Sequence, residues 1–170
     1  MIELDSVASL PAGPAVYALY GGRGRGLHVA YVGSARDLRI RLTQHLIRRD
    51  SSITTGASVV TLHVDAVTEA RWWEHADFSD ETHMLAAELV AFDVLDPVLR
   101  SRGQPQGAAQ SLAHDERFRG DMARVFTEDA TGRLRIPSLR DALERIDALE
   151  ERVRALERAL ERALGDHTRS

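Results

Sequence analysis

Three apolar stretches in the first part of the chain predict β-strands. The first two cover 15–20 (AVYALY) and 27–32 (LHVAYV), and the glycine-rich loop GGRGRG separates them. Short apolar stretches joined by such a loop are typical of an antiparallel hairpin. A third strand is expected at 58–67 (SVVTLHVDAV), because β-branched residues fill the middle of that stretch.

Alternation along the hairpin strands predicts which side chains share a face. Successive side chains of a strand point to opposite sides of the sheet. Tyr17 should therefore share a face with Leu19, and Tyr31 should share a face with Val29. It follows that both tyrosines can look at the same side of the sheet.

Leucines at intervals of four residues predict a helix after the second strand. The interval is kept by Leu38, Leu42 and Leu46. Ser34, followed three residues later by Asp37, resembles a capping box that would start this helix. Arg41 and His45 lie one helical turn apart, immediately beside the leucine stripe. A solvated helix face does not need that order, and an apolar core would reject both side chains.

A second helix is expected at 80–93 (DETHMLAAELVAFD), with Glu88 inside it between apolar neighbours. A carboxylate in such a place is expensive to bury unless it is paired or bound to a metal ion. The polar stretch 104–120 is expected to be a connector with some helix. The stretch 123–137 (ARVFTEDATGRLRIP) is expected to form a small hairpin that turns at 129–132.

The segment 138–165 repeats every seven residues, which predicts a coiled-coil helix. One seam position holds Leu139, Ile146, Val153 and Leu160, and the other holds Ala142, Leu149, Leu156 and Ala163. β-branched residues at the first position and leucines at the second favour a parallel homodimer. In that dimer the flanking Arg145 and Arg152 would meet Glu150 and Glu157 of the partner chain. A single helix packed on its own domain, an antiparallel pair and a tetramer remain alternatives.

Composition narrows the class of protein. A chain of 170 residues with 44% hydrophobic content is long enough for one domain with a core. The absence of a membrane-length apolar stretch and of a cleavable leader favours a cytoplasmic protein. The absence of cysteine excludes disulfides, thiolate zinc sites and cysteine nucleophiles. The net charge is -4, yet one early segment is rich in arginine and holds Arg23, Arg25, Arg36, Arg39, Arg41, Arg48 and Arg49.

The order of several residues resembles the GIY-YIG nuclease family. The residues that carry the resemblance are Ala15-Val16-Tyr17, Tyr31-Val32-Gly33, Arg41 with His45 on one helix, and Glu88 on a later helix. Any one of these motifs is weak, and the ordered set is much more specific. The resemblance covers roughly 10–103. It implies an α+β fold with a small three-stranded antiparallel sheet flanked by helices, and an endonuclease that uses Mg²⁺ (or Mn²⁺).

The resemblance also implies a role for each matched residue. Tyr17 would be the general base or would position the attacking water, and Tyr31 would share that task. Arg41 would grip the scissile phosphate with its planar fork, and His45 would orient the phosphate or the Tyr17 hydroxyl. Glu88 would hold the metal ion. The substrate would be nucleic acid, most plausibly double-stranded DNA.

The expected organisation is a nuclease domain at 1–103, a connector at 104–137 and a dimerisation helix at 138–165. Three positions depart from the family's pattern: Ala15 replaces its first glycine, Ser34 replaces a lysine common in relatives, and Arg100 stands where an asparagine is common. Arg23 and Arg25 of the glycine loop are candidates for contacts with a phosphate backbone. The alternative function is a non-catalytic module that binds nucleic acid or acts as an adaptor through the coiled coil.

Overall fold

The structure is a computed structural model, and it describes residues 1–4, 6–22, 26–48, 54–55, 58–59, 66–99, 107–137 and 139–167. The chain forms two compact units, Met1–Ile136 and Pro137–Ser170. None of the helices among the described residues is both long enough and apolar enough to cross a bilayer. The first unit is α+β, and one long helix forms most of the described part of the second.

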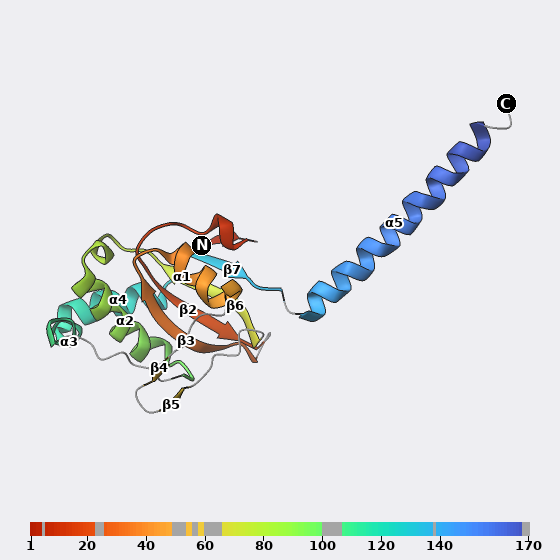
Figure 1. Ribbon diagram of the computed structural model, residues 1–170. Helices are drawn as coiled ribbons and strands as arrows, with labels where there is room; N and C mark the ends of the chain where they lie inside the picture. The colour runs from red at the N-terminus through yellow and green to blue at the C-terminus, as the bar shows by residue number, and fades with distance from the viewer. Residues whose placement is uncertain are drawn as a thin grey trace. The chain divides into compact units, whose positions relative to one another are not determined.

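A five-stranded mixed sheet forms the centre of the first unit (Figure 1). Its spatial order is β1-β7-β6-β2-β3. The strands are β1 Ile2–Leu4, β2 Ala15–Gly21, β3 His28–Ala35, β6 Val67–Trp73 and β7 Gly132–Arg135. Antiparallel pairing joins β7, β6, β2 and β3, whereas β1 pairs with β7 in parallel. The sheet therefore holds two strands more than the three expected from the sequence, and the additional strands are β1 and β7.

The hairpin of β2 and β3 confirms the first two predicted strands. In its register Tyr17 lies opposite Gly33, and Leu19 lies opposite Tyr31, so both tyrosines face the same side. The expectation for Val29 is wrong. A β-bulge follows the Leu19 pair, and Val29 pairs with Tyr20 and packs in the core on the opposite face. The extra residue of a bulge shifts the alternation by one, which strict period-two counting cannot anticipate.

The third strand of the sheet lies further along the chain than the sequence predicts. The third strand is β6, Val67–Trp73. Within the part of the chain that the structure describes, Ser58–Val59 (β5) pairs with Thr54–Thr55 (β4) in a separate two-stranded sheet. Residues 60–65 of the predicted strand lie outside the described residues. Charged Glu69 and Arg71 hide the strand character of β6. They form an ion pair, and the Arg71 guanidinium stacks over the Tyr20 ring at 4.5 Å.

The first helix begins later than its predicted capping box. Ser34 still belongs to β3, which ends at Ala35. Asp37 alone caps α1, Leu38–Thr43, because its carboxylate accepts a hydrogen bond from the Ile40 amide at 2.8 Å. A five-residue π-helical turn, Gln44–Arg48, continues α1. The predicted capping box is therefore wrong, because the hydroxyl of Ser34 is used elsewhere.

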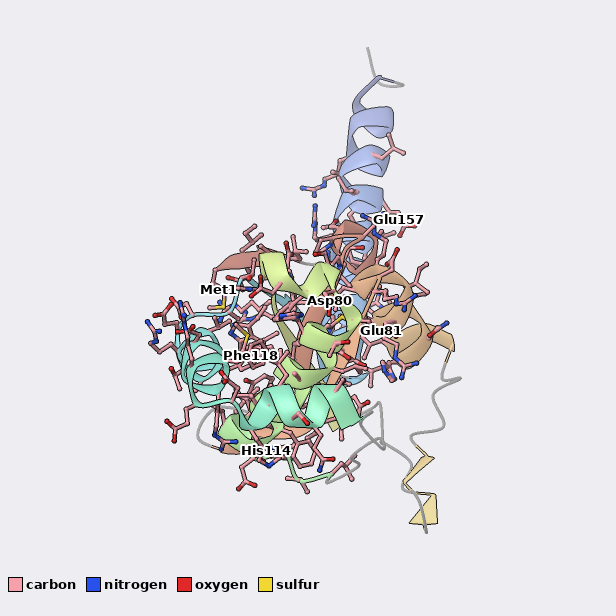
Figure 2. The ribbon with its side chains drawn as sticks, turned by 90° about the vertical axis from the view of Figure 1, so that its left-hand side faces the viewer. Met1, Asp80, Glu81, His114, Phe118 and Glu157 are labelled. Atoms are coloured by element: carbon pink, nitrogen blue, oxygen red, sulfur yellow. The ribbon has the colours of Figure 1, made fainter. Side chains whose placement is uncertain are left out.

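Helices cover the two faces of the sheet unequally. One face packs against α2 Glu81–Leu95, α3 Gly107–His114 and α4 Glu116–Thr127. In Figure 2 these helices lie in front of the sheet, with Asp80 and Glu81 at the start of α2 and Phe118 on α4. The other face packs against the short α1, whose Leu38 and Leu42 are buried. The predicted helix at 80–93 is confirmed.

The small hairpin expected at 123–137 is wrong. Helix α4 continues through Thr127, and the following residues enter the main sheet as the single strand β7. Strand β7 pairs with β6 on one side and with β1 on the other. A strand that finds its partners far away in the chain carries no hairpin signal of its own, and the four-residue β7 is too short for alternation to identify it.

Helix α5, Leu139–His167, makes up the described part of the second unit apart from Pro137. Its length agrees with the predicted helix at 138–165. Every side chain from 143 to 160 is exposed, including the apolar seam residues. The pairing of this helix with a second copy remains a prediction.

Candidate functional site

The structure brings together the five side chains singled out by the sequence. Tyr17 comes from β2, Tyr31 from β3, Arg41 from α1, His45 from the π-helical turn and Glu88 from α2. The rings of Tyr17, Tyr31 and His45 form a compact triangle. Their centroids are separated by 6.1 Å between the two tyrosines and by 5.8 Å from each tyrosine to His45.

Tyr17 and His45 form a buried hydrogen-bonded pair. The Tyr17 hydroxyl lies 2.7 Å from Nε2 of His45, and both side chains are 0% exposed. Burial, and then the charge of Arg41, lowers the pKa of His45 from 6.5 to about 4. Burial also raises the pKa of Tyr17. At neutral pH the pair therefore consists of a neutral imidazole and a neutral phenol.

The second ring nitrogen of His45 is an unpaired buried atom. Nδ1 has no hydrogen-bond partner among the described residues. A neutral imidazole has one N–H group and one acceptor nitrogen, so either tautomer leaves one of the two groups unsatisfied at a cost of roughly 1–3 kcal/mol. Unpaired buried groups are rare in folded proteins and call for an explanation.

The π-helical turn is the local device that holds His45. Four-residue spacing places Arg41 and His45 near one another, yet only His45 is fully buried. The turn Gln44–Arg48 replaces the α-helix after Thr43, which rotates the following side chains relative to an ideal helix. π-Turns are rare and often occur at functional sites. The sequence gives no sign of this turn, so the complete burial of His45 could not be predicted.

Arg41 lies beside the hydroxyl groups of Tyr17 and Tyr31. It is partly buried, and its guanidinium is within hydrogen-bonding reach of both Tyr17 and Tyr31. Burial opposes the arginine charge, but the two phenols outweigh this effect and raise the pKa of Arg41. The permanent charge is therefore held against polar oxygen atoms at a place where part of the side chain still meets solvent.

Glu88 approaches the same place from α2. Burial raises the pKa of its carboxyl group, whereas hydrogen bonds from Ser34 and the charge of Arg41 lower it. The Ser34 hydroxyl donates to Oε2 of Glu88, and the Ser34 backbone amide also bonds the carboxylate. Ser34 is thus the site residue whose role sequence reasoning missed. Its assignment to the helix start concealed that it faces α2 from strand β3.

The site lies at the β3 edge of the sheet. Strand β3 is the last strand in the spatial order, with α1 packed on one face and α2 on the other. Tyr31 points to the α1 side and interacts with the charge of Glu88, which comes from the α2 side. Elements on opposite faces of a sheet can place side chains together only around such an edge. The position explains how Arg41 and Glu88 reach one site.

Exposure separates the five side chains into two sets. Arg41 and Glu88 are partly exposed and Tyr31 is 8% exposed, whereas Tyr17 and His45 have no exposed surface. A ligand that arrives from solvent can touch the first set directly. Tyr17 and His45 lie behind them as a supporting pair. Direct contact of Tyr17 with a ligand would require a movement that opens the site.

Gly33 keeps the two tyrosines close together. A Cβ atom at this position would lie 2.9 Å from the Tyr17 hydroxyl oxygen and 2.9 Å from Cε1 of Tyr31. Such distances are shorter than those real Cβ atoms adopt, so any side chain here would displace a ring. The need for glycine after Tyr31-Val32 is therefore one of packing. Its backbone has no positive φ that would demand glycine.

The donor set at Glu88 fits a hard divalent cation. Mg²⁺ keeps several of its waters and needs only one or two protein carboxylates, together with phosphate oxygens. Glu88 supplies one carboxylate, Ser34 fixes its orientation, and burial makes the negative charge costly until a cation arrives. Groups of three or more potential ligand side chains do not occur among the described residues. An ion at Glu88 would thus take its other ligands from water and substrate.

Comparison of the chain with models of protein families, with curated proteins and with solved structures finds no match. The family resemblance therefore depends on the residues themselves and on their geometry. Arg23 and Arg25 of the glycine loop, and Arg100, lie outside the described residues.

Proposed function

We propose that this protein is a metal-dependent endonuclease that hydrolyses phosphodiester bonds of DNA through a GIY-YIG-type site. The observation that carries the proposal is the convergence of Tyr17, Tyr31, Arg41, His45 and Glu88 at one sheet edge. These residues come from separate elements, and an accidental match of the motif would give no reason for them to meet.

Arg41 supports the proposal as the phosphate-binding group. Its partly exposed guanidinium is always charged and presents N–H donors in a planar fork that matches two phosphate oxygens. Negative charge on the non-bridging oxygens increases as water attacks phosphorus. Donors already held in place stabilise that charge without reorganisation, and removal of one such donor typically costs 10²–10³ in rate. The two phenols hold Arg41 in place.

The Tyr17–His45 pair supports the proposal as the proton acceptor. The attacking water forms a bond to phosphorus and must lose a proton. Tyr31 lies in front of Tyr17, with which it is hydrogen-bonded, and the Tyr17 hydroxyl lies 2.7 Å from Nε2 of His45. A proton taken up at the phenols can thus move to His45, while the bond from phosphorus to the leaving oxygen breaks. The leaving oxygen then takes a proton from solvent.

Substrate binding would strengthen His45 as a base. The charge of Arg41 is the second cause, after burial, of the lowered pKa of His45. A phosphate on Arg41 offsets that charge and raises the pKa of His45 toward its ordinary value. The base therefore becomes more effective once the substrate is present. This coupling gives Arg41 and His45 a reason to lie one turn apart on a helix.

Glu88 is the residue that would hold Mg²⁺, with Ser34 orienting its carboxylate. A bound Mg²⁺ supplies stabilisation of negative charge on phosphate and leaving-group oxygens. Mn²⁺ has similar ligand preferences and is expected to substitute.

Cleavage of supercoiled plasmid tests the proposed function. The wild-type protein should nick or linearise the plasmid with Mg²⁺ and should not do so with a chelator. Arg41→Ala and Glu88→Gln should each lose at least about a hundredfold in rate. Glu81→Gln is the matched control, because Glu81 lies on the same helix and its side chain is exposed in a surface ion pair with Arg36.

The results separate the enzyme from a non-catalytic module. Salt-sensitive binding of duplex, single-stranded and branched DNA without cleavage of any of them would contradict the proposal and favour the module. Cleavage that persists in Glu88→Gln, or with chelator, would overturn the site. The Glu88→Gln protein should keep its DNA affinity and should have a Tm no lower than that of the wild type, because glutamine removes a costly buried charge and preserves the shape of the side chain.

A further inference from the structure

The apolar seam of α5 is the largest set of exposed apolar side chains in the described part of the chain. Its members are Ile146, Leu149, Val153, Leu156 and Leu160, with exposures between 49% and 69%. The segment forms a compact unit separate from Met1–Ile136. Most helical stability in proteins comes from packing of an apolar face, and isolated helices are marginal in water. A helix with this composition needs a partner.

The seam residues favour a coiled coil of two helices. Ile146 and Val153 occupy the first seam position, and Leu149 and Leu156 occupy the second. β-Branched residues at the first position and leucine at the second fit the knobs-into-holes geometry of a parallel dimer. Packing of this kind would bury the seam along about four heptads, which is roughly 40 Å of helix at 1.5 Å per residue.

The flanking charges decide the orientation. Arg145 and Arg152 lie on one side of the seam, and Glu150 and Glu157 lie on the other. In a parallel pair each arginine faces a glutamate of the second helix. In an antiparallel pair the arginines would face one another, and so would the glutamates. We infer that α5 pairs in parallel with α5 of a second copy of this chain.

Existing contacts of these residues are compatible with this pairing. Glu150 accepts a hydrogen bond from Arg154 of its own helix at 3.0 Å. A carboxylate has two oxygens and can accept from more than one donor, so Arg145 of the second copy can bind it as well. Both groups are more than half exposed, with side-chain exposures of 62% for Arg154 and 58% for Glu150. The contact within one chain therefore does not block the contact between chains.

Parallel pairing has a consequence for cleavage that rests on the proposed function. Helix α5 begins at Leu139, only a few residues after the first unit ends at Ile136. A parallel pair therefore brings the two copies of Met1–Ile136 to the same end of the coiled coil. Two sites tethered near one duplex act at high effective concentration. The dimer is expected to cut both strands of a duplex in one encounter.

The mass in solution tests the pairing without any need for activity. Sedimentation of the full chain should give twice the mass of the 18.8 kDa chain. The double variant Leu149→Asp/Leu156→Asp should sediment as a monomer. The matched control is Ala148→Asp/Ala155→Asp, which places the same charges on exposed positions outside the seam and should remain a dimer. Near-ultraviolet circular dichroism from Trp72 and Trp73 reports whether the first unit is still folded.

A single cysteine tests the orientation, because the chain has none of its own. Under mild oxidation Ile146→Cys should form a disulfide with itself in a parallel pair. Glu151→Cys, on the outer surface of the coil, should not. An antiparallel pair would leave Ile146→Cys reduced, since its counterpart would lie at the far end of the helix. That outcome would overturn the inference, as would a monomeric or tetrameric wild-type protein.

The two proposals fail in different ways. A dimer that cuts no DNA contradicts the nuclease and leaves the pairing intact. A monomer that cuts DNA contradicts the pairing and leaves the nuclease intact. For an active dimer, the linear product should appear before nicked plasmid accumulates, and the seam variant should produce mainly nicked circles.

Discussion

The two units of this chain depart in opposite ways from the usual pattern of apolar side chains inside and polar side chains outside. Met1–Ile136 buries polar chemistry, with His45 and Tyr17 at 0% exposure in the core beside Leu38 and Leu42. Helix α5 exposes apolar side chains that an ordinary surface helix would cover. A buried polar group and an exposed apolar stripe both cost free energy. The two proposals account for these costs by a polar, charged ligand at the first unit and by a second helix at α5.

The contrast also concerns how each unit specifies its partner. At the sheet edge, the proposed recognition would use atoms that neighbouring elements hold in fixed positions. Gly33 illustrates this packing, since there is no room for a side chain beside Tyr17 and Tyr31. Along α5, the proposed pairing would use a repeating pattern that any register-matched copy satisfies. Changes in the first unit should affect chemistry or folding, and changes in the second should affect assembly.

The largest effect is expected from Arg41→Lys. Lysine keeps the charge and loses the planar fork, so cleavage should fall by about a hundredfold while DNA binding changes little. The dimer should be unaffected, because Arg41 lies in the first unit. Single-turnover cleavage and sedimentation of the same sample check both statements. Full activity of Arg41→Lys would mean that Arg41 supplies only a diffuse positive charge.

The helices that carry this site could be predicted from the sequence, because the signals for a helix are local. The spacing of Leu38 and Leu42 gave α1, and Glu88 stood out between apolar neighbours on a helix that the structure confirms. The mixed five-stranded sheet could not be predicted, because β1 and β7 pair although they lie far apart in the sequence. The third strand was predicted too early in the chain, because Glu69 and Arg71, which form an ion pair, interrupt the apolar pattern of β6.

Buried His45 should make the stability of the first unit depend on pH. Its pKa is lowered from 6.5 to about 4, so the unfolded chain binds the proton more tightly. The contribution is fully present above pH 6.5 and is lost as the pH falls toward 4. A shift of this size corresponds to about 3 kcal/mol of unfolding free energy. Denaturant unfolding between these pH values should reveal it.

His45→Gln is the control for this pH dependence. Glutamine can place a polar atom near the position of Nε2 and does not titrate, so the variant should lose this part of the pH dependence. The dissociation constant of α5 pairing should not change in the variant, because the histidine belongs to the other unit. An equally steep pH dependence in His45→Gln would assign the effect to another group.

Gly132→Ala should destabilise the first unit by about 2 kcal/mol. Gly132 lies opposite Trp72 in the pairing of β7 with β6, and a Cβ atom there would overlap the Trp72 indole. Gly120→Ala is the matched control. Gly120 lies in α4 with open space around the new methyl group, and should gain about 1 kcal/mol from helix propensity. Denaturant unfolding followed by tryptophan fluorescence measures both.

The same pair of glycine variants sharpens the contrast between the units. Sedimentation at low denaturant should show α5 still paired in Gly132→Ala when the first unit has begun to unfold. Loss of pairing together with the fold of the first unit would show that the two units depend on one another. The sequence could not have ranked these glycines, since only the register of β7 on β6 places Gly132 under an indole.

Ser34→Ala should give the smallest effect, on metal affinity rather than on the maximal rate. The Ser34 hydroxyl bonds Oε2 of Glu88, and loss of a residue that orients a metal ligand typically costs about tenfold or more in affinity. The Mg²⁺ concentration for half-maximal cleavage should therefore rise about tenfold, with little change at saturation. Ser34→Thr should restore the wild-type value, because it keeps the hydroxyl.

Ser34→Ala also allows the loss of a single contact in the first unit to be compared with a disrupted seam in α5. The hydroxyl acts over a single contact to one carboxylate, so its loss should be compensated completely by more Mg²⁺. No concentration of metal should compensate for a charged residue in the α5 seam. Calorimetry of Mg²⁺ binding in the absence of DNA provides a readout that does not depend on cleavage. Unchanged affinity in Ser34→Ala would mean that the Glu88 carboxylate is oriented by its packing in α2 alone.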